Sequence, residues 1–218
     1  MIRVLAFLVR RPGLSREAFR EYYEGTHVPT ALPLLGGVTH YVRHHLREEL
    51  HGRPGFDCMT AVEYPAVAAM DALLARLDGP EGEPVRSDEL RFMDKPANAY
   101  VAVETERGFE EERPAPAEIL VCVGRPVAAA PEAFRAQLAR DALPALRAAL
   151  RPSWCRAQWA CAGPARGASF DAVIQLGAAG AAGIGAWARD VESAGACVVA
   201  VRVTSHATAV PAPPGAGG

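Results

Sequence analysis

An internal repeat is the feature of this chain that most restricts its fold. The second copy of the repeated block begins 115 residues after the first, at position 132 instead of 17. The matches are Glu17-Ala18-Phe19-Arg20 with Glu132-Ala133-Phe134-Arg135, Pro29 with Pro144, and Phe56-Asp57 with Phe170-Asp171. His27, by contrast, falls on Ala142. We therefore expect one fold built twice, with a reactive side chain kept in the first copy alone.

Hydrophobic patterning predicts the same order of elements in both copies, strand-helix-strand-strand-helix-strand. In the first copy we expect strands at 2–10, 38–46, 56–64 and 99–103, and helices that begin near Ser15 and Val67. In the second copy we expect strands at 119–123, 154–161, 170–176 and 196–204, and helices from Pro131 and Ile184. Because Pro29 restricts the residue before it, Val28 is expected to leave the helix and His27 to lie at its end.

This order predicts an α+β fold of two ferredoxin-like βαββαβ repeats, each with an antiparallel sheet and both helices on one face. The two sheets can cover each other and close into one α+β barrel around a cavity. We expect residues 1–105 to form the half that carries the site and 118–208 a degenerate second half. The acidic, proline-bearing segment 106–117 is a predicted linker, and 209–218 a disordered tail.

Composition excludes some classes of partner. The 218 residues carry a formal net charge of -2 and no basic run, which argues against nucleic acid or an anionic membrane surface. No apolar stretch is long enough to span a bilayer, so we expect a soluble, cytoplasmic protein. The five cysteines are scattered and form no CxxC pair, which is typical of reduced thiols.

His27 is the first candidate catalytic residue. An imidazole titrates near neutral pH and can both take and return a proton. A surface histidine at a frayed helix end is the alternative. The repeat favours the catalytic role, because the residues around His27 match between the copies and His27 does not.

The strand 39–45 carries the next candidates. Alternation places Tyr41, Arg43 and His45 on one face and His40 and His44 on the other. We expect Tyr41 to face the site and Arg43, His44 and His45 to be candidates for substrate binding; protective charges on an edge strand are the alternative. A metal site from these histidines is disfavoured, since neighbours on a strand point apart and no third ligand is evident.

Three further residues complete the predicted site. Asp94 could orient a histidine or accept a proton, although an Asp before Pro96 also suits a turn. Thr60 and Phe92 are expected to contact a substrate. No phosphate-binding loop, nucleophile elbow or dinucleotide glycine pattern is present.

Taken together, these segments resemble the EthD-like family of dimeric α+β barrel proteins. The residues that carry the resemblance are Arg11 to Phe19, His27-Val28-Pro29, Tyr41-Val42-Arg43, Phe56-Asp57, Phe92-Met93-Asp94 and the strand 101–104. The resemblance covers roughly residues 2 to 105 and implies a fused pseudo-dimer that could pair further into a homodimer. It also implies that His27 and Tyr41 line the cavity and that no metal or organic cofactor is needed.

Our leading hypothesis is a cofactor-independent cyclase, dehydratase or isomerase that acts on a small aromatic or polyketide-like carbonyl compound. His27 is its base, Tyr41 binds the enolate, and Asp94 orients a partner or protonates a leaving group. A cofactor-free monooxygenase on a phenol is the first alternative. A non-catalytic carrier of hydrophobic small molecules is the second.

Overall fold

The computed structural model describes residues 1–106, 116–161, 170–177 and 180–210, and within these ranges eight strands form one closed barrel. The first-half strands are β1 (Ile2–Leu8), β2 (His40–His51), β3 (Cys58–Tyr64) and β4 (Ala99–Thr105). The second-half strands are β5 (Ile119–Gly124), β6 (Trp154–Ala160), β7 (Ala172–Gly177) and β8 (Cys197–Ala207). Each strand pair in the barrel is antiparallel.

The strand order is the same in the two halves. It runs β4-β1-β3-β2 in the first half and β8-β5-β7-β6 in the second. Two seams join the halves, one between β2 and β8 and the other between β4 and β6. Closure pairs the edges that an open sheet would expose. The predicted α+β barrel of two βαββαβ repeats is confirmed.

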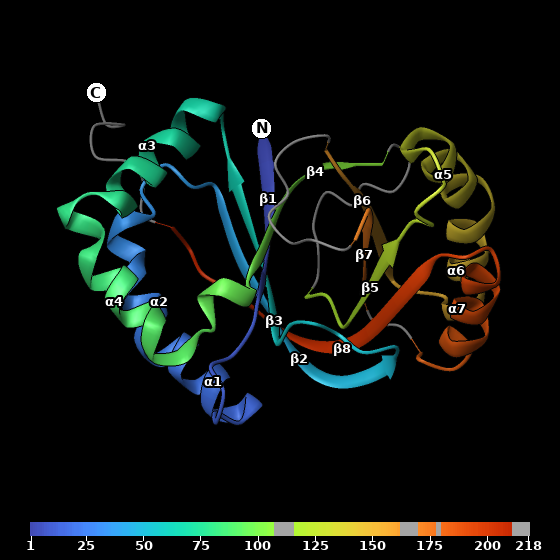
Figure 1. Cartoon of the computed structure of the whole chain (residues 1–218), viewed down its shortest axis with the longest axis horizontal. Coiled ribbons are helices and arrows are strands. Elements are labelled where there is room, and N and C mark those ends of the chain that lie inside the picture. The colour runs from blue at the N-terminus through green and yellow to red at the C-terminus, as the bar shows by residue number, and fades with distance from the viewer. Residues whose placement is uncertain (107–115, 162–169, 178–179, 211–218) are drawn as a thin grey trace.

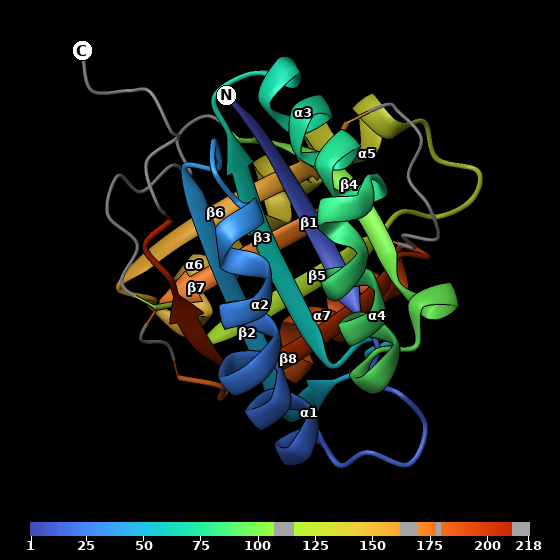
Figure 2. The same ribbon diagram turned by 90° about the vertical axis from the view of Figure 1, so that its left-hand side faces the viewer.

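Helices cover the outer face of each sheet, so the molecule has a helix layer on either side of the barrel (Figure 1). The first-half layer contains α1 (Arg16–Tyr22), the π-helical turn η1 (Tyr23–His27), α2 (Val28–Ala31), α3 (Val67–Asp78) and α4 (Glu83–Phe92). The second-half layer contains α5 (Pro131–Gln137), the π-helical turn η5 (Leu138–Ala142), α6 (Leu143–Leu150) and α7 (Ile184–Ser193). Figure 2 shows the first layer lying over β1, β2 and β3.

Three apolar clusters hold these layers together. One lies between the first sheet and its helices and includes Phe19, Tyr23 and Phe92. A second lies between the second sheet and its helices. The third fills the barrel with side chains such as Leu5 and Leu120, which are completely buried. In the space between the two sheets, where the sequence predicted a cavity, alternating strand residues pack as a core.

A hydrogen-bonded turn occurs at equivalent places in the two halves. The Arg10 backbone N–H and Nε donate to the two carboxylate oxygens of Asp57 at 3.0 and 3.1 Å. In the second half, the N–H and Nε of Arg125 donate to Asp171 at 2.8 and 2.9 Å. Each arginine also donates through Nη1 to a backbone carbonyl four residues later. The two halves thus share a local frame and not only a strand order.

Most predicted elements are present with small shifts in their ends. Ser15 caps α1, accepting a hydrogen bond from the Ala18 backbone N–H at 3.1 Å. The prediction that Val28 leaves the helix is wrong, because its φ and ψ of -58° and -50° are helical. Pro29 lies near the start of α2, where a missing N–H costs little. The predicted linker and tail lie largely outside the described residues.

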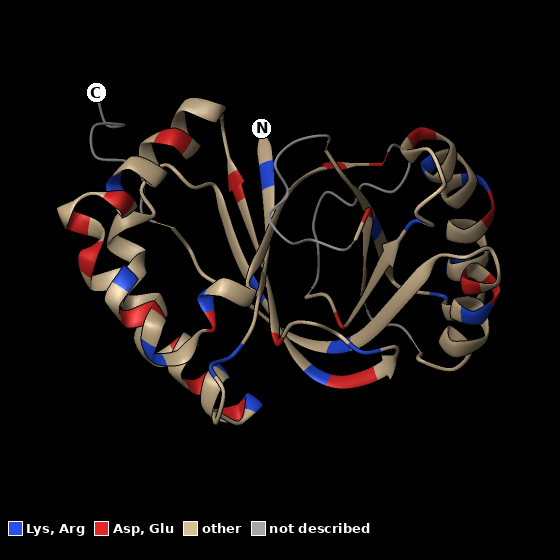
Figure 3. Cartoon of the chain, in the orientation of Figure 1, with Lys and Arg blue, Asp and Glu red and all other residues tan. Residues whose placement is uncertain are grey.

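Helix α4 was not predicted. The segment contains prolines and charged residues, and only Val85, Asp88 and Phe92 of this helix are buried. Acidic and basic residues alternate over both helix layers (Figure 3). Within the described ranges, every helix is too short or too polar to cross a membrane.

The repeated turn leads to a stability prediction. Asp57→Ala removes three charged hydrogen bonds, including one from Arg16 Nε at 3.2 Å, from a carboxylate that is only 9% exposed. We expect a loss of about 2–3 kcal/mol of unfolding free energy. Asp171→Ala serves as the matched variant; its side chain is 33% exposed, and we expect about 1 kcal/mol. Urea unfolding measures the loss of unfolding free energy in both variants. Equal losses would contradict the expectation that the more buried Asp57 contributes more.

Candidate active site

The π-helical turn η1 positions the histidine that the sequence singled out. A π turn contains one more residue than an α turn and is common at functional sites. Here it carries Tyr23, Glu24 and His27 between α1 and α2, and His27 is 4% exposed. The equivalent turn η5 carries Leu138 and Ala142. The π turn therefore carries polar side chains at these positions in the first half and apolar side chains at the matching positions in the second.

His27 is oriented by a carboxylate from α4. Its Nδ1 lies 2.9 Å from Asp88 Oδ2, and both side chains are less than 10% exposed. The Tyr22 hydroxyl donates to Asp88 Oδ1 at 2.6 Å, and this hydrogen bond raises the pKa of Tyr22. The Phe92 ring packs 4.9 Å from the imidazole. Because the carboxylate accepts the Nδ1 proton, neutral His27 presents Nε2 as its free basic nitrogen.

A chain of hydroxyl groups lies beside this pair. Tyr41 donates to the Tyr23 hydroxyl at 3.4 Å, and the Tyr23 and Thr60 hydroxyls lie 2.9 Å apart. The Tyr23 ring is 5.2 Å from the His27 ring. Burial raises the pKa of Tyr41 to about 12 and the pKa of Tyr23 well above its ordinary value. Both phenols therefore stay protonated at neutral pH and can donate hydrogen bonds.

Glu24 ties the π turn to strand β2. Arg43 donates to its carboxylate through Nε at 3.1 Å and Nη2 at 2.5 Å, and His45 Nε2 lies 2.6 Å from Oε1. Burial opposes ionisation of Glu24, but the hydrogen bonds from His45 and Arg43 outweigh it and lower the pKa of the carboxyl to about 2. His206 of β8 approaches to 3.9 Å. The last strand of the second half thus reaches this cluster.

The predicted alternation along β2 is confirmed. Tyr41, Arg43 and His45 point toward the helix layer, where they meet η1. His44 is on the opposite face, and its Nδ1 lies 2.7 Å from Ser205 Oγ of β8. Burial lowers the pKa of His44 to about 3, so it is neutral at physiological pH. His44 is therefore separated by the sheet from the group around His27.

The structure places some of the other predicted residues beside His27 and others away from it. It gives the place beside His27 to Asp88, whereas the Asp94 backbone carbonyl accepts from Ala97 N–H in a turn. Phe92 and Thr60 do lie in the cluster, from α4 and β3. No group of three or more metal-ligating side chains occurs among the described residues.

Sequence reasoning missed Asp88, Glu24 and Tyr23 as functional groups. Asp88 was missed with α4 itself, although Val85, Asp88 and Phe92 follow helical spacing after a proline. Glu24 precedes His27 by three residues, a separation that puts two side chains on one face of an ordinary helix. In the π turn they diverge instead, Glu24 toward β2 and His27 toward α4.

Comparison with known proteins agrees with this fold. The sequence profile described as the EthD domain matches residues 11–96, the part that carries His27 and Asp88. No curated protein matches the chain.

Several solved structures share the whole architecture. An anthrone oxidase-like protein has a TM-score of 0.58 at 13% identity, covering 97% of this chain and 94% of its own. A candidate chlorite dismutase has a TM-score of 0.53 at 10% identity, with coverages of 94% and 95%. A candidate monooxygenase from Fusobacterium nucleatum subsp. nucleatum has a TM-score of 0.52 at 9% identity, with coverages of 96% and 95%. At such identities the likeness shows the fold alone.

The Glu24 cluster leads to a prediction about pH. The lowered pKa means that Glu24 contributes stability above its unfolded value of 4.5, and that this contribution is lost as the pH falls toward about 2. Glu24→Gln removes this part of the acid sensitivity. It also leaves Arg43, 1% exposed, without its counter-charge, so we expect a loss of about 3 kcal/mol at pH 7.

Urea unfolding between pH 2 and 7 measures both effects. Glu21→Gln, an exposed glutamate of α1, is the matched control and should change neither. An unchanged acid profile in Glu24→Gln would show that the cluster does not govern stability.

Proposed function

We propose that this chain is a cofactor-independent enzyme in which His27 is the general base for a small aromatic or polyketide-like carbonyl compound. The observation that carries the proposal is the buried contact of 2.9 Å between His27 Nδ1 and Asp88 Oδ2. Asp88 stabilises the imidazolium that forms when Nε2 takes a proton. A positioned base of this kind contributes about 10²–10⁴-fold to a rate.

The hydroxyl groups supply the second part of the mechanism. His27 removes the proton α to the substrate carbonyl, and the electron pair of the broken C–H bond moves to the carbonyl oxygen. Tyr41 or Tyr23 turns its O–H toward this enolate oxygen, an electrostatic stabilisation of the oxyanion-hole type. His27 then returns the proton to another carbon, which completes an isomerisation, or to a departing hydroxyl, which completes a dehydration.

The remaining predicted residues take supporting roles in this proposal. Phe92 and Thr60 contact the substrate from α4 and β3. Arg43 and His45 are engaged by Glu24, so they act as positioning residues that hold η1 against the sheet. Asp94 is replaced by Asp88 as the partner of His27.

We further propose that the chain is a fused pseudo-dimer, with residues 1–105 as the working half and 118–208 as its partner. The matching strand order, the two π turns and the paired Arg–Asp turns support this. Ala142 at the place of His27 means that the second half cannot run the same proton transfer. It contributes His206 and Ser205 to the contacts of β2.

A cofactor-free monooxygenase is the second candidate. It is favoured by the names of the structural neighbours, an anthrone oxidase-like protein and a candidate monooxygenase. The same base would deprotonate a phenol, and the electron-rich phenolate would react with molecular oxygen. Oxygen consumption coupled to product formation separates this reaction from isomerisation or dehydration.

The test of the base is deuterium exchange. In heavy water, wild-type protein is incubated with a panel of aromatic and polyketide-like carbonyl compounds, and mass spectrometry reads incorporation. We expect His27→Ala to abolish catalysed exchange and Asp88→Asn to reduce its rate by roughly 10²-fold, because the amide no longer stabilises the imidazolium. Tyr41→Phe should slow exchange by about 10²-fold or less, since Tyr23 can still donate.

His51→Gln is the control for loss of a histidine. His51 lies at the far end of β2 and pairs with Glu192 of α7. The His51→Gln variant should catalyse deuterium exchange at the wild-type rate. Equal exchange in wild type and His27→Ala would refute the assignment of the base. Saturable binding without exchange or oxygen uptake on any substrate would favour the carrier.

A further inference from the structure

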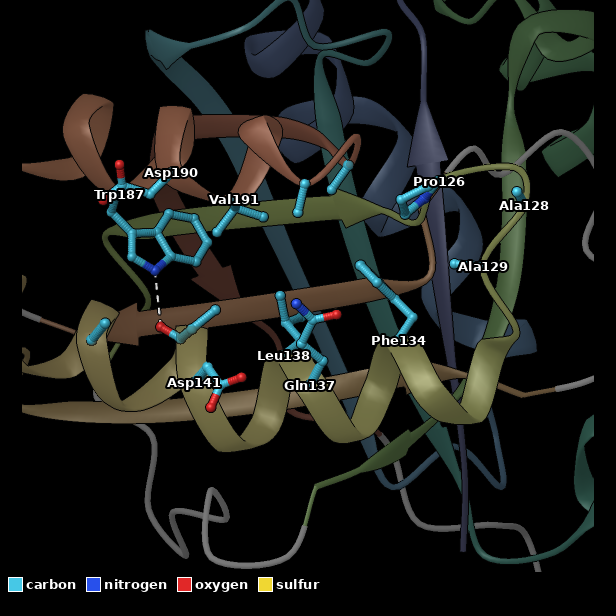
Figure 4. Close-up of a pocket in the computed structure, with 14 residues that line it drawn as sticks. Pro126, Ala128, Ala129, Phe134, Gln137, Leu138, Asp141, Trp187, Asp190 and Val191 are labelled. Carbon is cyan, nitrogen blue, oxygen red and sulfur yellow. Dashed lines mark hydrogen bonds between the residues drawn. The ribbon is translucent and has the colours of Figure 1, made fainter.

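A pocket of about 550 Å³ lies in the second half, on the outer side of its sheet. Its walls are the continuous helical segment α5-η5-α6 on one side and α7 on the other (Figure 4). Phe134 and Trp187 stand toward opposite ends, with Leu138 and Val191 between them (Figure 4). The volume is within the range of about 300–1,000 Å³ that is usual for small-molecule sites.

The pocket occupies the place that the aromatic cluster fills in the first half. Phe134 matches Phe19, and Ala142, which lines the pocket, matches His27. The sequence pattern paired α7 with the helix from Val67, but by its place directly before the last strand α7 corresponds to α4. Leu120 pairs with Val201 as Leu5 pairs with Val101.

The halves differ in the rings that fill this space, since Tyr23 of the first half falls on Leu138 and the second half has Trp187 instead of Asp88. The Trp187 indole Nε1 donates to the Ala142 carbonyl at 2.9 Å, as Asp88 meets His27. One helical turn after Asp88, Phe92 is completely buried, and its ring centroid lies 5.5 Å from that of Phe19 and 5.4 Å from that of Tyr23. One turn after Trp187 the chain has Val191. The first half therefore fills with its own phenyl ring a space that the second half leaves open.

The polar groups of the pocket select by charge. The polar side chains among the lining residues are Gln137, Asp141, Asp190 and the Trp187 indole. Lys, Arg and His are absent from the described lining, and Arg140 pairs with Asp141 on the exposed side of the helix. The lining thus offers an anion no cationic side chain, and the exposed Asp190 carboxylate at its edge disfavours a second negative charge.

We propose that the second half, which lacks the catalytic histidine, binds a planar aromatic molecule that carries no negative charge. The ring enters between Phe134 and Trp187, in the space that corresponds to Phe92. A neutral or cationic polar group points toward the rim, where Gln137 and Asp190 accept hydrogen bonds. This site is distinct from the His27 site, from which the barrel separates it.

Isothermal titration calorimetry with three naphthalene probes tests the proposal. We expect 2-naphthol and protonated 2-naphthylmethylamine to bind, and 2-naphthoate to bind at least tenfold more weakly. Val191→Phe adds one phenyl ring to the pocket, as Phe92 does in the first half, so it should weaken binding of the first two probes at least tenfold. Ala145→Phe fills the same pocket from α6 and should give the same result if Val191→Phe fails to fold.

Leu74→Phe is the matched control. It adds a ring at an exposed position of α3 and should leave binding unchanged. Deuterium exchange that depends on His27 should survive in Val191→Phe, which separates this site from the proposed catalytic one. Undiminished binding in both filled variants, equal binding of the naphthoate, or no saturable binding to wild type would each overturn the proposal.

Discussion

The contact between Glu24 and β2 is the interaction on which the first half depends. A carboxylate from a helical turn reaches into a buried environment and is met there by Arg43 and His45. Burying the Arg43 charge is costly unless a partner of opposite charge is fixed in place. The pair therefore specifies where η1 lies on the sheet. Tyr23 and His27, which are in the same turn, take their positions from it.

The cluster around Glu24 also connects the two halves. Arg43 pairs in the β2–β8 ladder with His206, which lies 3.9 Å from Glu24, and His44 pairs with Ser205. At the seam between β2 and β8, polar side chains thus lie on both faces of the sheet. At the other seam, three residue pairs join β4 to β6 among the described residues. Strand β8 of the second half therefore supports the cluster around Glu24.

Much of the fold could be predicted from the sequence because its signals are local. Alternation in β2 correctly separated His44 from Arg43 and His45, and Ser15 marked the start of α1. Helix α4 was not found, since a helix with only three buried residues gives a weak periodic signal. The partner of His27 was missed with it. A contact between residues 61 positions apart has no local signature, and Asp94, nearer to a recognisable segment, was chosen instead.

The conformation of the π turn was also beyond local rules. Pro29 normally disfavours a helical residue before it, yet Val28 stays helical because the π turn shifts the backbone groups that the proline would otherwise disrupt. The cavity was placed inside the barrel for a similar reason. Strand alternation tells which residues share a face, but not whether the shared space is filled. Side-chain volume decides that, and among the described residues the barrel interior contains a cluster of buried apolar side chains.

Among the three buried histidines of the first half, we propose His27 and not His45 as the base. Both contact a carboxylate, but Glu24 already faces the full charge of Arg43. Arg43 largely compensates the negative charge of Glu24. Burial lowers the pKa of His45 despite its contact with this carboxylate. Asp88 receives only the neutral Tyr22 hydroxyl in addition to His27 in the described structure. In the proposed mechanism, this carboxylate stabilises the imidazolium that forms when His27 takes the proton of the substrate.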